Sequence, residues 1–383
     1  MKVGVVVETA SNETRVSLVP ETVRKLRGLG WDVLVQNGAG KTSFLSDADY
    51  ADAGATLIDN AADVARQSDA LLSVRAPDPK LIDQMQRGST LIALLDPMRS
   101  PDLLAHLARL QIDSIAMELI PRITRAQSMD VLSSQATAAG YRAVLLASVA
   151  SSRFFPMLMT AAGTIAPARV LVLGAGVAGL QAIATARRLG AIVQGFDIRP
   201  AVKEQVESLG AQWVGVQVSG SETAAGYAKE TTAAEQQRLQ DHLSKIVSEA
   251  DIVITTAQVP GRRAPVLITK AMVERMKPGA VIVDLAAESG GNCELTRGGE
   301  DVVANGVTVI GPLNLAAGLA THASQMYSRN LATLLQHLKT DEGIKLDITD
   351  EIVGVCCVTH SGKVRVQEGR VPTPEPAPVA AGV

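Results

Sequence analysis

The stretch Ala168–Asp197, ARVLVLGAGVAGLQAIATARRLGAIVQGFD, decides the fold. Its apolar run predicts a strand over Arg169–Leu173, the glycine-rich turn Gly174–Gly179 follows, and the run Leu180–Leu189 predicts a helix. With G-x-G-x-x-G spacing, the glycines permit a tight turn, let the backbone approach a pyrophosphate and let the helix pack closely on the strand. The amino terminus of the helix then faces the anion. The stretch therefore predicts a dinucleotide-binding unit.

An acidic residue at the end of the next strand predicts which dinucleotide is bound. The strand Ile192–Phe196 leads into Asp197, about 20 residues after the glycine turn, where a carboxylate accepts hydrogen bonds from the adenosine ribose. The same carboxylate repels a phosphate on the 2′-hydroxyl, so we predict NAD(H) rather than NADP(H). Arg199 could compensate for that phosphate. We interpret it instead as a solvated arginine, or as one that grips the pyrophosphate or a neighbouring helix.

Outward from this unit, an alternation of strands and helices predicts two domains. A long helix over Ser133–Ser151 leads into the second domain, residues 133–315, whose further strands are expected at Trp213–Val216, Ile252–Thr255, Ala280–Asp284 and Val307–Ile310. The first domain, residues 1–132, has expected strands at Val3–Val7, Asp32–Gln36, Ala70–Val74, Thr90–Leu95 and Asp113–Met117, and expected helices at Pro20–Leu29 and Pro101–Leu110. We expect an amphipathic helix at 316–340 and the segment to about 370 to complete it. The Pro- and Ala-rich tail 371–383 is predicted to be disordered.

Composition agrees with this fold class and excludes several functions. Of 383 residues, 47% are hydrophobic and only 3% aromatic, as expected of parallel sheets covered by helices. A formal net charge of -3 argues against nucleic acid as a partner. The apolar stretch Ala143–Ala162 contains Ser, Arg and Pro, so we interpret it as a buried helix and connection rather than a membrane span. The three cysteines lack C-x-x-C spacing, which fits a reducing cytoplasm, and no metal site is predicted. We therefore expect an α/β protein with two doubly wound Rossmann-like domains and a cleft between them.

A dense polar loop, Pro121–Gln135, precedes the long helix. It contains no obvious nucleophile and no histidine that could act as a general base, which fits direct hydride transfer, a reaction that needs neither. Some of these residues have another interpretation, because Asp130 or Ser133 could simply cap the following helix.

Several motifs together resemble one family. Arg122–Gln135, Ala161–Thr164 and Leu180–Ala186 closely resemble the NAD(H)-binding component, domain I of the alpha subunit, of proton-translocating nicotinamide nucleotide transhydrogenase. The resemblance extends over nearly the whole chain and includes Lys203–Gly210, Ala225–Glu230 and Ala286–Cys293.

The resemblance implies roles for particular residues. Arg122, Gln127, Asp130 and Ser133 would surround the nicotinamide, and the loop that carries Gly226 and Tyr227 would fold over the nucleotide. The implied cofactor-binding residues are Gly174, Gly176, Val177, Gly179, Asp197, Ile198, Arg199, Gly226, Tyr227 and Gln258. It also implies that NADP(H) binds to a partner subunit, that a further subunit spans the membrane, and that this chain is a homodimer. The chain would be cytoplasmic and peripheral at the inner face of the cell membrane.

Two other functions stay open. The start Glu8–Pro20, with Arg15, resembles that of alanine dehydrogenase, but Arg75 and Asp96 stand where such an enzyme would have a lysine and a histidine. We interpret Arg15 and Arg75 as solvated or paired with Glu8 or Glu118. The third possibility is a non-catalytic NAD(H) sensor.

Overall fold

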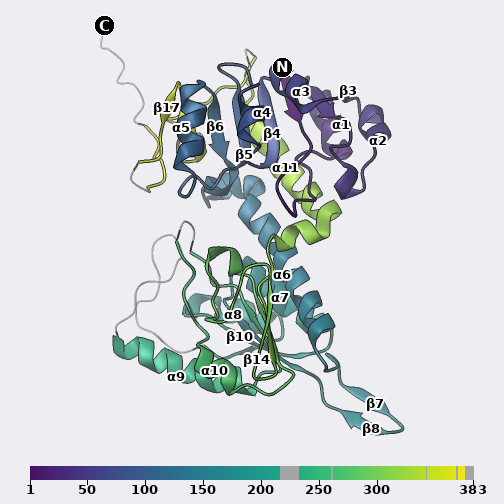
Figure 1. Cartoon of the computed structure of the whole chain (residues 1–383), viewed down its shortest axis with the longest axis vertical. Helices are drawn as coiled ribbons and strands as arrows, with labels where there is room; N and C mark the ends of the chain where they lie inside the picture. Colours follow the sequence, from purple (N-terminus) through teal and green to yellow (C-terminus); the bar gives the residue numbers. More distant parts are fainter. Residues whose placement is uncertain (216–232, 260–261, 342, 368–369, 376–383) are drawn as a thin grey trace. The chain divides into compact units, whose positions relative to one another are not determined.

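A computed structural model describes residues 1–215, 233–259, 262–341, 343–367 and 370–375. The chain forms two compact units (Figure 1): unit 1 consists of Met1–Gln135 and Ala317–Val383, and unit 2 consists of Ala136–Ala316. Each unit contains a largely parallel sheet covered by helices, which confirms the predicted α/β class with Rossmann-like sheets.

Unit 1 is built on a sheet of eight strands in the order β17-β16-β6-β5-β4-β1-β2-β3. Strands β1 to β6 are parallel, whereas β16 and β17 are antiparallel additions at one edge. The bounds are β1 (Lys2–Val5), β2 (Asp32–Gln36), β3 (Thr56–Ile58), β4 (Ala70–Arg75), β5 (Thr90–Leu94), β6 (Asp113–Ala116), β16 (Cys357–His360) and β17 (Lys363–Val364). The six parallel strands follow the Rossmann order 3-2-1-4-5-6.

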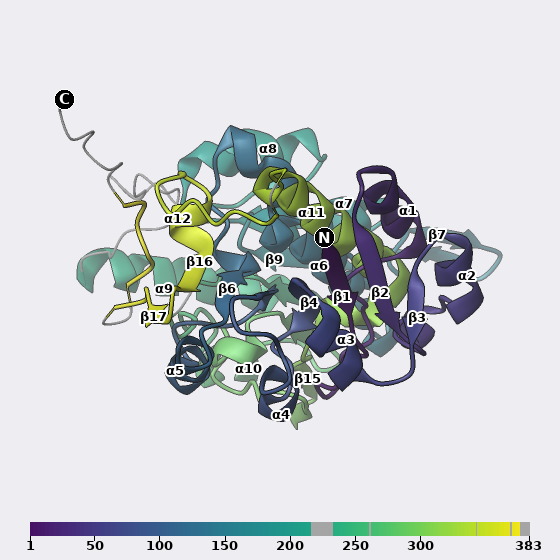
Figure 2. The ribbon, with the colours of Figure 1, turned by 90° about the horizontal axis from the view of Figure 1, so that it is seen from above.

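Helices cover both faces of this sheet. Figure 2 shows α3 (Ala61–Gln67), α4 (Pro79–Ile82) and α5 (Pro101–Arg109) along one face, and α1 (Pro20–Gly28), α11 (Ala320–Leu338) and α12 (Val353–Cys356) along the other. A short helix, α2 (Asp47–Asp52), begins with a capping box on Ser46. Proline occupies the first turn of α1, α4 and α5, where its missing N–H costs no hydrogen bond.

The late helix α11 completes the core of unit 1. Tyr327 is fully buried and donates a hydrogen bond to the Ser73 carbonyl at 2.9 Å. The hydroxyls of Ser324 and Ser328, also on α11, accept hydrogen bonds from the backbone amides of Val16 and Val19, both at 3.0 Å. The segment after residue 316 is therefore an integral part of the first unit.

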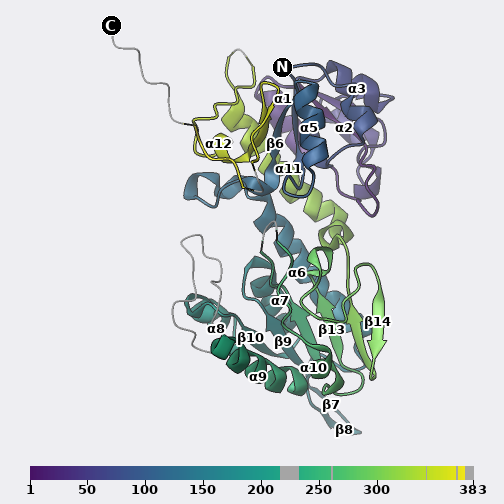
Figure 3. The same cartoon turned by 60° about the vertical axis from the view of Figure 1, so that its left-hand side comes forward.

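Unit 2 is built on a sheet of seven strands in the order β11-β10-β9-β12-β13-β15-β14, of which only β14 is antiparallel. The bounds are β9 (Arg169–Leu173), β10 (Ile192–Phe196), β11 (Gln212–Trp213), β12 (Ile252–Thr255), β13 (Val281–Asp284), β14 (Asp301–Ala304) and β15 (Val307–Ile310). Side chains from α6 (Val131–Ala150), α7 (Val177–Arg188) and α8 (Lys203–Ser208) pack on one face. The other face is covered by α9 (Ala233–Glu249) and α10 (Lys270–Glu274), which lie together in Figure 3.

One stretch differs from the prediction. Ala143–Ala162 is not a buried helix and connection throughout: α6 ends at Ala150, and a hairpin of β7 (Leu158–Thr160) and β8 (Gly163–Ile165) follows. Val149 is 87% exposed and Met159 is 78% exposed. The hairpin can turn because Gly163 adopts a φ of 116°.

The ends of other predicted segments also differ. Residues 371–375 of the expected disordered tail are bonded within unit 1, where the Glu375 amide donates to the Ile348 carbonyl at 2.9 Å, and residues 376–383 lie outside the described chain. The strand expected at Trp213–Val216 is β11, and Val216 lies outside the described residues. No helix in the described ranges is both long and apolar enough to cross a lipid bilayer.

Candidate functional site

The glycine turn joins β9 to α7 in unit 2 and leaves no room for larger side chains. Gly174 has a φ of 102°, and a Cβ added there would lie 2.5 Å from Thr256 Oγ1. A Cβ at Gly179 would lie 1.8 Å from the Gly174 carbonyl oxygen, so helix and turn meet closely. By contrast, a Cβ at Gly176 would meet nothing within 4 Å. The side of the turn next to Gly176 is therefore open, as backbone contact with a phosphate requires.

The amino terminus of α7 begins at this open side. Gly176 is its N-cap residue, and no described side chain caps the helix. Val177, at the first position of the helix, is 40% exposed. The first-turn amides of a helix have no partner within the helix, so this end can bind an anion such as a pyrophosphate.

Asp197 follows β10 and is almost fully buried beside the turn. Its Oδ2 accepts a hydrogen bond from the Ala175 amide at 2.8 Å, and its Oδ1 accepts one from the Arg199 amide at 2.9 Å. The Arg199 guanidinium pairs with both carboxylate oxygens, from Nε and Nη2, at 2.9 Å each. Arg199 is therefore not the solvated or helix-bound arginine that we expected. Because it lies only two residues after Asp197, its side chain reaches back to the carboxylate.

The loop after β12 lies next to the glycine turn. Thr256 Oγ1 donates to the Gly174 carbonyl at 3.0 Å, and Gln258, which is exposed, donates from Nε2 to the Leu285 carbonyl at 2.7 Å. Asn292 holds the loop from its other side: its Oδ1 accepts from the Ala257 amide at 3.0 Å, and its Nδ2 donates to the Ala257 carbonyl at 2.8 Å. Ile198, beyond Asp197, is partly buried.

Sequence reasoning missed Asp284, which ends β13 and is fully buried. Its carboxylate accepts five hydrogen bonds, from Thr255 Oγ1 at 2.8 Å, the Ala286 amide at 3.0 Å, the Asn292 amide at 2.7 Å, the Cys293 amide at 3.0 Å and Thr296 Oγ1 at 2.6 Å. It thus fixes the loop that carries Asn292. The available signal was a carboxylate at the end of a buried strand, the pattern that had singled out Asp197.

The polar loop in unit 1 is arranged around the start of α6. Asp130 Oδ1 accepts from the Ser133 amide at 2.9 Å, and Asp130 Oδ2 accepts from the Ser133 hydroxyl at 2.7 Å, so these two residues are brought together as a helix cap. Gln127, on the 3-10 helix η3 (Thr124–Met129), and Arg122 are both exposed. Their side chains are accessible to a ligand or to another protein.

Arg15 does not pair with Glu8 or Glu118, as expected, but with Glu13. The guanidinium donates from Nε and Nη2 to the two Glu13 oxygens at 2.8 and 2.6 Å, and both side chains are buried. Arg75 Nε lies 3.6 Å from the same carboxylate. Glu13 therefore already neutralises the cations that an amino-acid dehydrogenase would offer to a substrate carboxylate.

Two remaining predictions have particular outcomes. Gly226 and Tyr227, the expected residues of the closing loop, lie outside the described residues. Within the described ranges, no group of three or more His, Cys, Asp or Glu side chains could hold a metal ion. Cys293 is buried, which raises the pKa of its thiol to about 11, so it is not a reactive thiolate near neutral pH.

Comparisons with known proteins agree with these features. Residues 4–139 and 143–367 match the N-terminal and C-terminal domains of the family described as Alanine dehydrogenase/PNT. The chain is 44% identical over 374 residues to an NAD(P) transhydrogenase alpha subunit of Rhodospirillum rubrum, covering 95% of this chain and 97% of that protein. The solved transhydrogenase of Sinorhizobium meliloti is 45% identical, with a TM-score of 0.87 over 95% of this chain and 100% of that one.

Alanine dehydrogenases are more distant. That of Mycolicibacterium smegmatis is 32% identical over 300 residues, covering 78% of this chain and 75% of that protein. The transhydrogenase likeness is therefore stronger in identity and extends further along both chains. This chain belongs to the alanine dehydrogenase/PNT family and, within it, stands with the alpha subunits of NAD(P) transhydrogenases.

Proposed function

We propose that this chain is the NAD(H)-binding subunit of a proton-translocating transhydrogenase and passes a hydride directly between NADH and NADP⁺ held on a partner subunit. The observation that carries the proposal is the buried carboxylate of Asp197 beside the glycine turn. A carboxylate there accepts the ribose hydroxyls of NAD(H) and opposes a 2′-phosphate, so the two nucleotides stay on separate subunits.

The cofactor is proposed to bind along the carboxyl edge of the unit 2 sheet. Gly174, Gly176, Val177 and Gly179 would cradle the pyrophosphate, and Asp197, Ile198 and Arg199 would contact the adenosine half. Gln258 and the Gly226–Tyr227 segment would complete the site. The open side of the turn at Gly176 supports this assignment.

The polar loop is proposed to serve the nicotinamide end. Gln127 would hydrogen-bond the nicotinamide ribose or a facing group, while Arg122, Asp130 and Ser133 would keep the ring in a productive geometry. Because hydride transfer needs no acid or base from the protein, positioning supplies most of the rate enhancement. The exposure of Gln127 and Arg122 supports contact with a second nucleotide brought by another subunit.

The assembly is proposed to contain further subunits, one that binds NADP(H) and one that spans the membrane. This chain would be a homodimer, cytoplasmic and peripheral at the inner membrane face. Exposed apolar side chains at Val149, Phe154, Met157, Met159 and Ile165 support a protein interface. Residues 133–315 would be the NAD(H)-binding domain, and residues 1–132, completed by 316–340 and the segment to about 370, the other domain.

A mixing experiment tests the function. The purified chain is combined with the family's separate NADP-binding domain, and hydride transfer from NADH to an NADP analogue is followed by absorbance. We expect turnover only in the mixture. Intact NADH binding without turnover would identify a sensor instead. NADH oxidation by the chain alone, dependent on pyruvate and ammonia, would identify an alanine dehydrogenase.

A further inference from the structure

The sheet of unit 1 has a topological switch point that the proposed function does not use. Strand β1 lies between β2 and β4, and the chain winds outward to β3 on one side and to β6 on the other. In open parallel sheets, ligands bind outside the carboxyl ends of the strands at such a point. The carboxyl ends of β1 and β4 lead here into Glu8 and Ala76.

A cavity of about 420 Å³ lies at this point. Its walls are mainly apolar, and they come from the segments after β1 and β4 and from α3 and α4. The apolar lining consists of Val7, Ala61, Ala62, Ala76, Pro77 and Leu81. Its polar groups are Glu8, Thr9, Ser73, Asp78, Lys80 and Gln84. A volume of this size and lining is typical of small-molecule sites.

The cavity is not suited to a nucleotide. The segment after β1 reads VVETASN over residues 6–12, without a glycine that would let the backbone approach a phosphate. Glu8 stands at the place of the phosphate-binding turn, and its charge repels phosphate oxygens. A ligand of the opposite charge is favoured.

Glu8 is held firmly with its carboxyl group at the cavity. Its Oε1 accepts from the Val74 amide at 2.6 Å and lies 3.1 Å from the Ser73 hydroxyl, while its Oε2 accepts from the Arg75 amide at 3.1 Å. Each carboxylate oxygen has two lone-pair directions, so Oε2 can accept one more donor. The pairing of β4 with β5 also shifts register between Leu72 and Arg75, a kind of bulge that is common beside functional sites.

Several charged and titratable groups act on Glu8. Burial raises its pKa to about 7, and the charge of Glu13 adds to the rise, in spite of the hydrogen bonds from the backbone amides. Tyr327, from α11, interacts with it electrostatically, and Asp78 and Lys80 line the same cavity. The charges of Asp78 and Lys80 offset each other, which leaves Glu8 to set the sign of the cavity.

We propose that this cavity binds a small organic ammonium ion whose apolar body lies against the alanine, proline and leucine side chains while its N–H group donates to Glu8 Oε2. Binding is expected to be favoured by ionisation of Glu8, since the ligand supplies the counter-charge that burial otherwise removes. The site is independent of the nucleotide-binding residues in unit 2.

Titration of the full chain with n-butylamine tests the proposal, with n-butanol as the uncharged ligand of equal size. Isothermal titration calorimetry is run at pH 6 and pH 8. We expect saturable binding of the amine, about tenfold tighter at pH 8, because the ionised fraction of Glu8 rises from about one tenth to about nine tenths. The alcohol should bind at least about tenfold more weakly at pH 8.

Two variants and a control complete the test. Glu8→Gln should abolish the preference for amine over alcohol and the pH dependence. Ala62→Leu fills the cavity but keeps Glu8, so it should remove binding of both ligands even if Glu8→Gln fails to fold. Glu21→Gln, an exposed glutamate on α1, should change nothing. Equal binding of amine and alcohol, absence of saturable binding, or amine binding that survives Ala62→Leu would overturn the proposal.

Discussion

The ion pair between Asp197 and Arg199 places a cation against the carboxylate that selects the cofactor. The carboxylate alone opposes a 2′-phosphate, whereas a guanidinium at 2.9 Å offsets some of that repulsion. The degree of discrimination between NADH and NADPH therefore depends on both residues.

Substitution of Arg199 by Ala should sharpen the preference for NADH. Without the guanidinium, the charge of Asp197 acts on the 2′-phosphate uncompensated, and the ratio of the Kd for NADPH to the Kd for NADH should rise about tenfold, or about 1.4 kcal/mol. Asp197→Asn should lower the same ratio. Calorimetric titration with both nucleotides measures it. Equal weakening of both nucleotides in Arg199→Ala would instead assign the arginine to the pyrophosphate.

Gln127 offers a test of the nicotinamide end. Gln127→Asn shortens the side chain by one methylene, which displaces its amide without changing its chemistry. We expect hydride transfer in the reconstituted mixture to slow by about 10-fold to 100-fold, because small displacements of positioning groups have effects of that size. The Kd for NADH should stay within about twofold of wild type, since the pyrophosphate and ribose contacts are untouched. A large loss of NADH binding would contradict the assignment.

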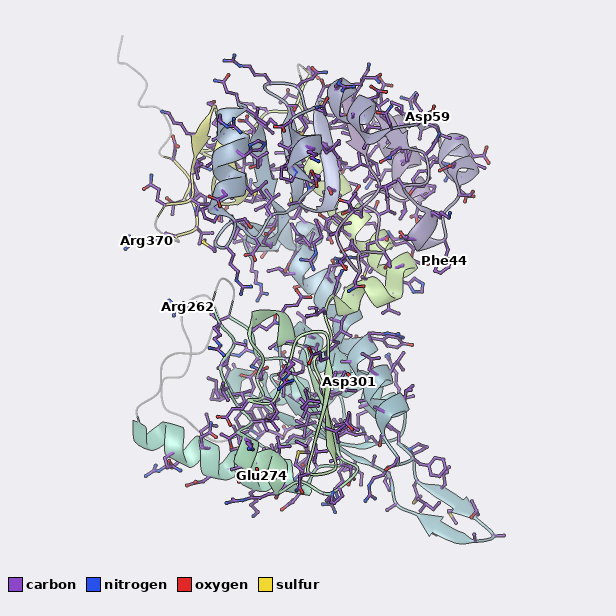
Figure 4. All side chains as sticks on the ribbon, viewed as in Figure 1. Phe44, Asp59, Arg262, Glu274, Asp301 and Arg370 are labelled. Atoms are coloured by element: carbon purple, nitrogen blue, oxygen red, sulfur yellow. The ribbon has the colours of Figure 1, made fainter. Side chains whose placement is uncertain are left out.

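Among loops, helices and strands, the segment after β13 depends on one carboxylate. Asp284→Asn turns an amide N–H₂ towards groups that are themselves donors, so we expect a loss of about 3 kcal/mol in the free energy of unfolding. NADH affinity should fall as well, because the loop carries Asn292, which holds Ala257. Asp301→Asn, an exposed aspartate labelled in Figure 4, is the matched control and should change stability by less than about 0.5 kcal/mol. Similar melting temperatures for the two variants would refute this role of Asp284.

The carboxyl-terminal segment of unit 1 carries a pH-dependent contact. Burial disfavours the charge of Asp350, but hydrogen bonds from the Val353 amide, His337 and the Ile352 amide outweigh it and lower the pKa of Asp350 to about 2. A depressed folded pKa gives stability that is present above the ordinary value near 4 and lost as pH falls towards 2.

Asp350→Asn should therefore cost about 2 kcal/mol of unfolding free energy at pH 6, and the difference from wild type should shrink as pH falls from about 4 to about 2. Urea denaturation at several pH values, with unit 1 followed by its own probe, measures the difference. Asp59→Asn, an exposed aspartate in the same unit, serves as the control. A difference that stays constant with pH would show that the charge of Asp350 does not matter.

The same scale explains what the sequence could and could not predict. Buried parallel strands such as Arg169–Leu173 and Ile252–Thr255 were predicted with their observed bounds, because continuous β-branched and leucine runs leave little choice. Strands β3 and β16 were missed, since short segments form through pairing with neighbours rather than from their own pattern. The glycine turn is a local signal. The contacts of Asn292 with Ala257 join residues 35 apart, which no periodicity connects.

At the scale of the molecule, exposed apolar side chains near β7 and β8 predict how the chain self-associates. Met159 is 78% exposed and Ile165 is 44% exposed, and such residues are usually covered in an oligomer. The double substitution Met159→Lys and Ile165→Lys should weaken a dimer of the 40.0 kDa chain at least about tenfold. Sedimentation velocity over a concentration series measures this change. Phe44→Lys, at an exposed apolar residue in unit 1, is the control, and equal dimerisation of all three proteins would rule out the hairpin as the interface.

The division of unit 1 into two segments has a consequence for synthesis on the ribosome. Strands β1 to β6 emerge first, but Tyr327, Leu331 and Leu335 of α11, which belong to the same core, emerge only after the whole of unit 2. At roughly 5 to 20 residues per second, the intervening 136–316 segment takes roughly 10 to 35 seconds to translate. During that delay one face of the first sheet stays uncovered, so the nascent chain offers chaperones an apolar surface that the finished protein hides.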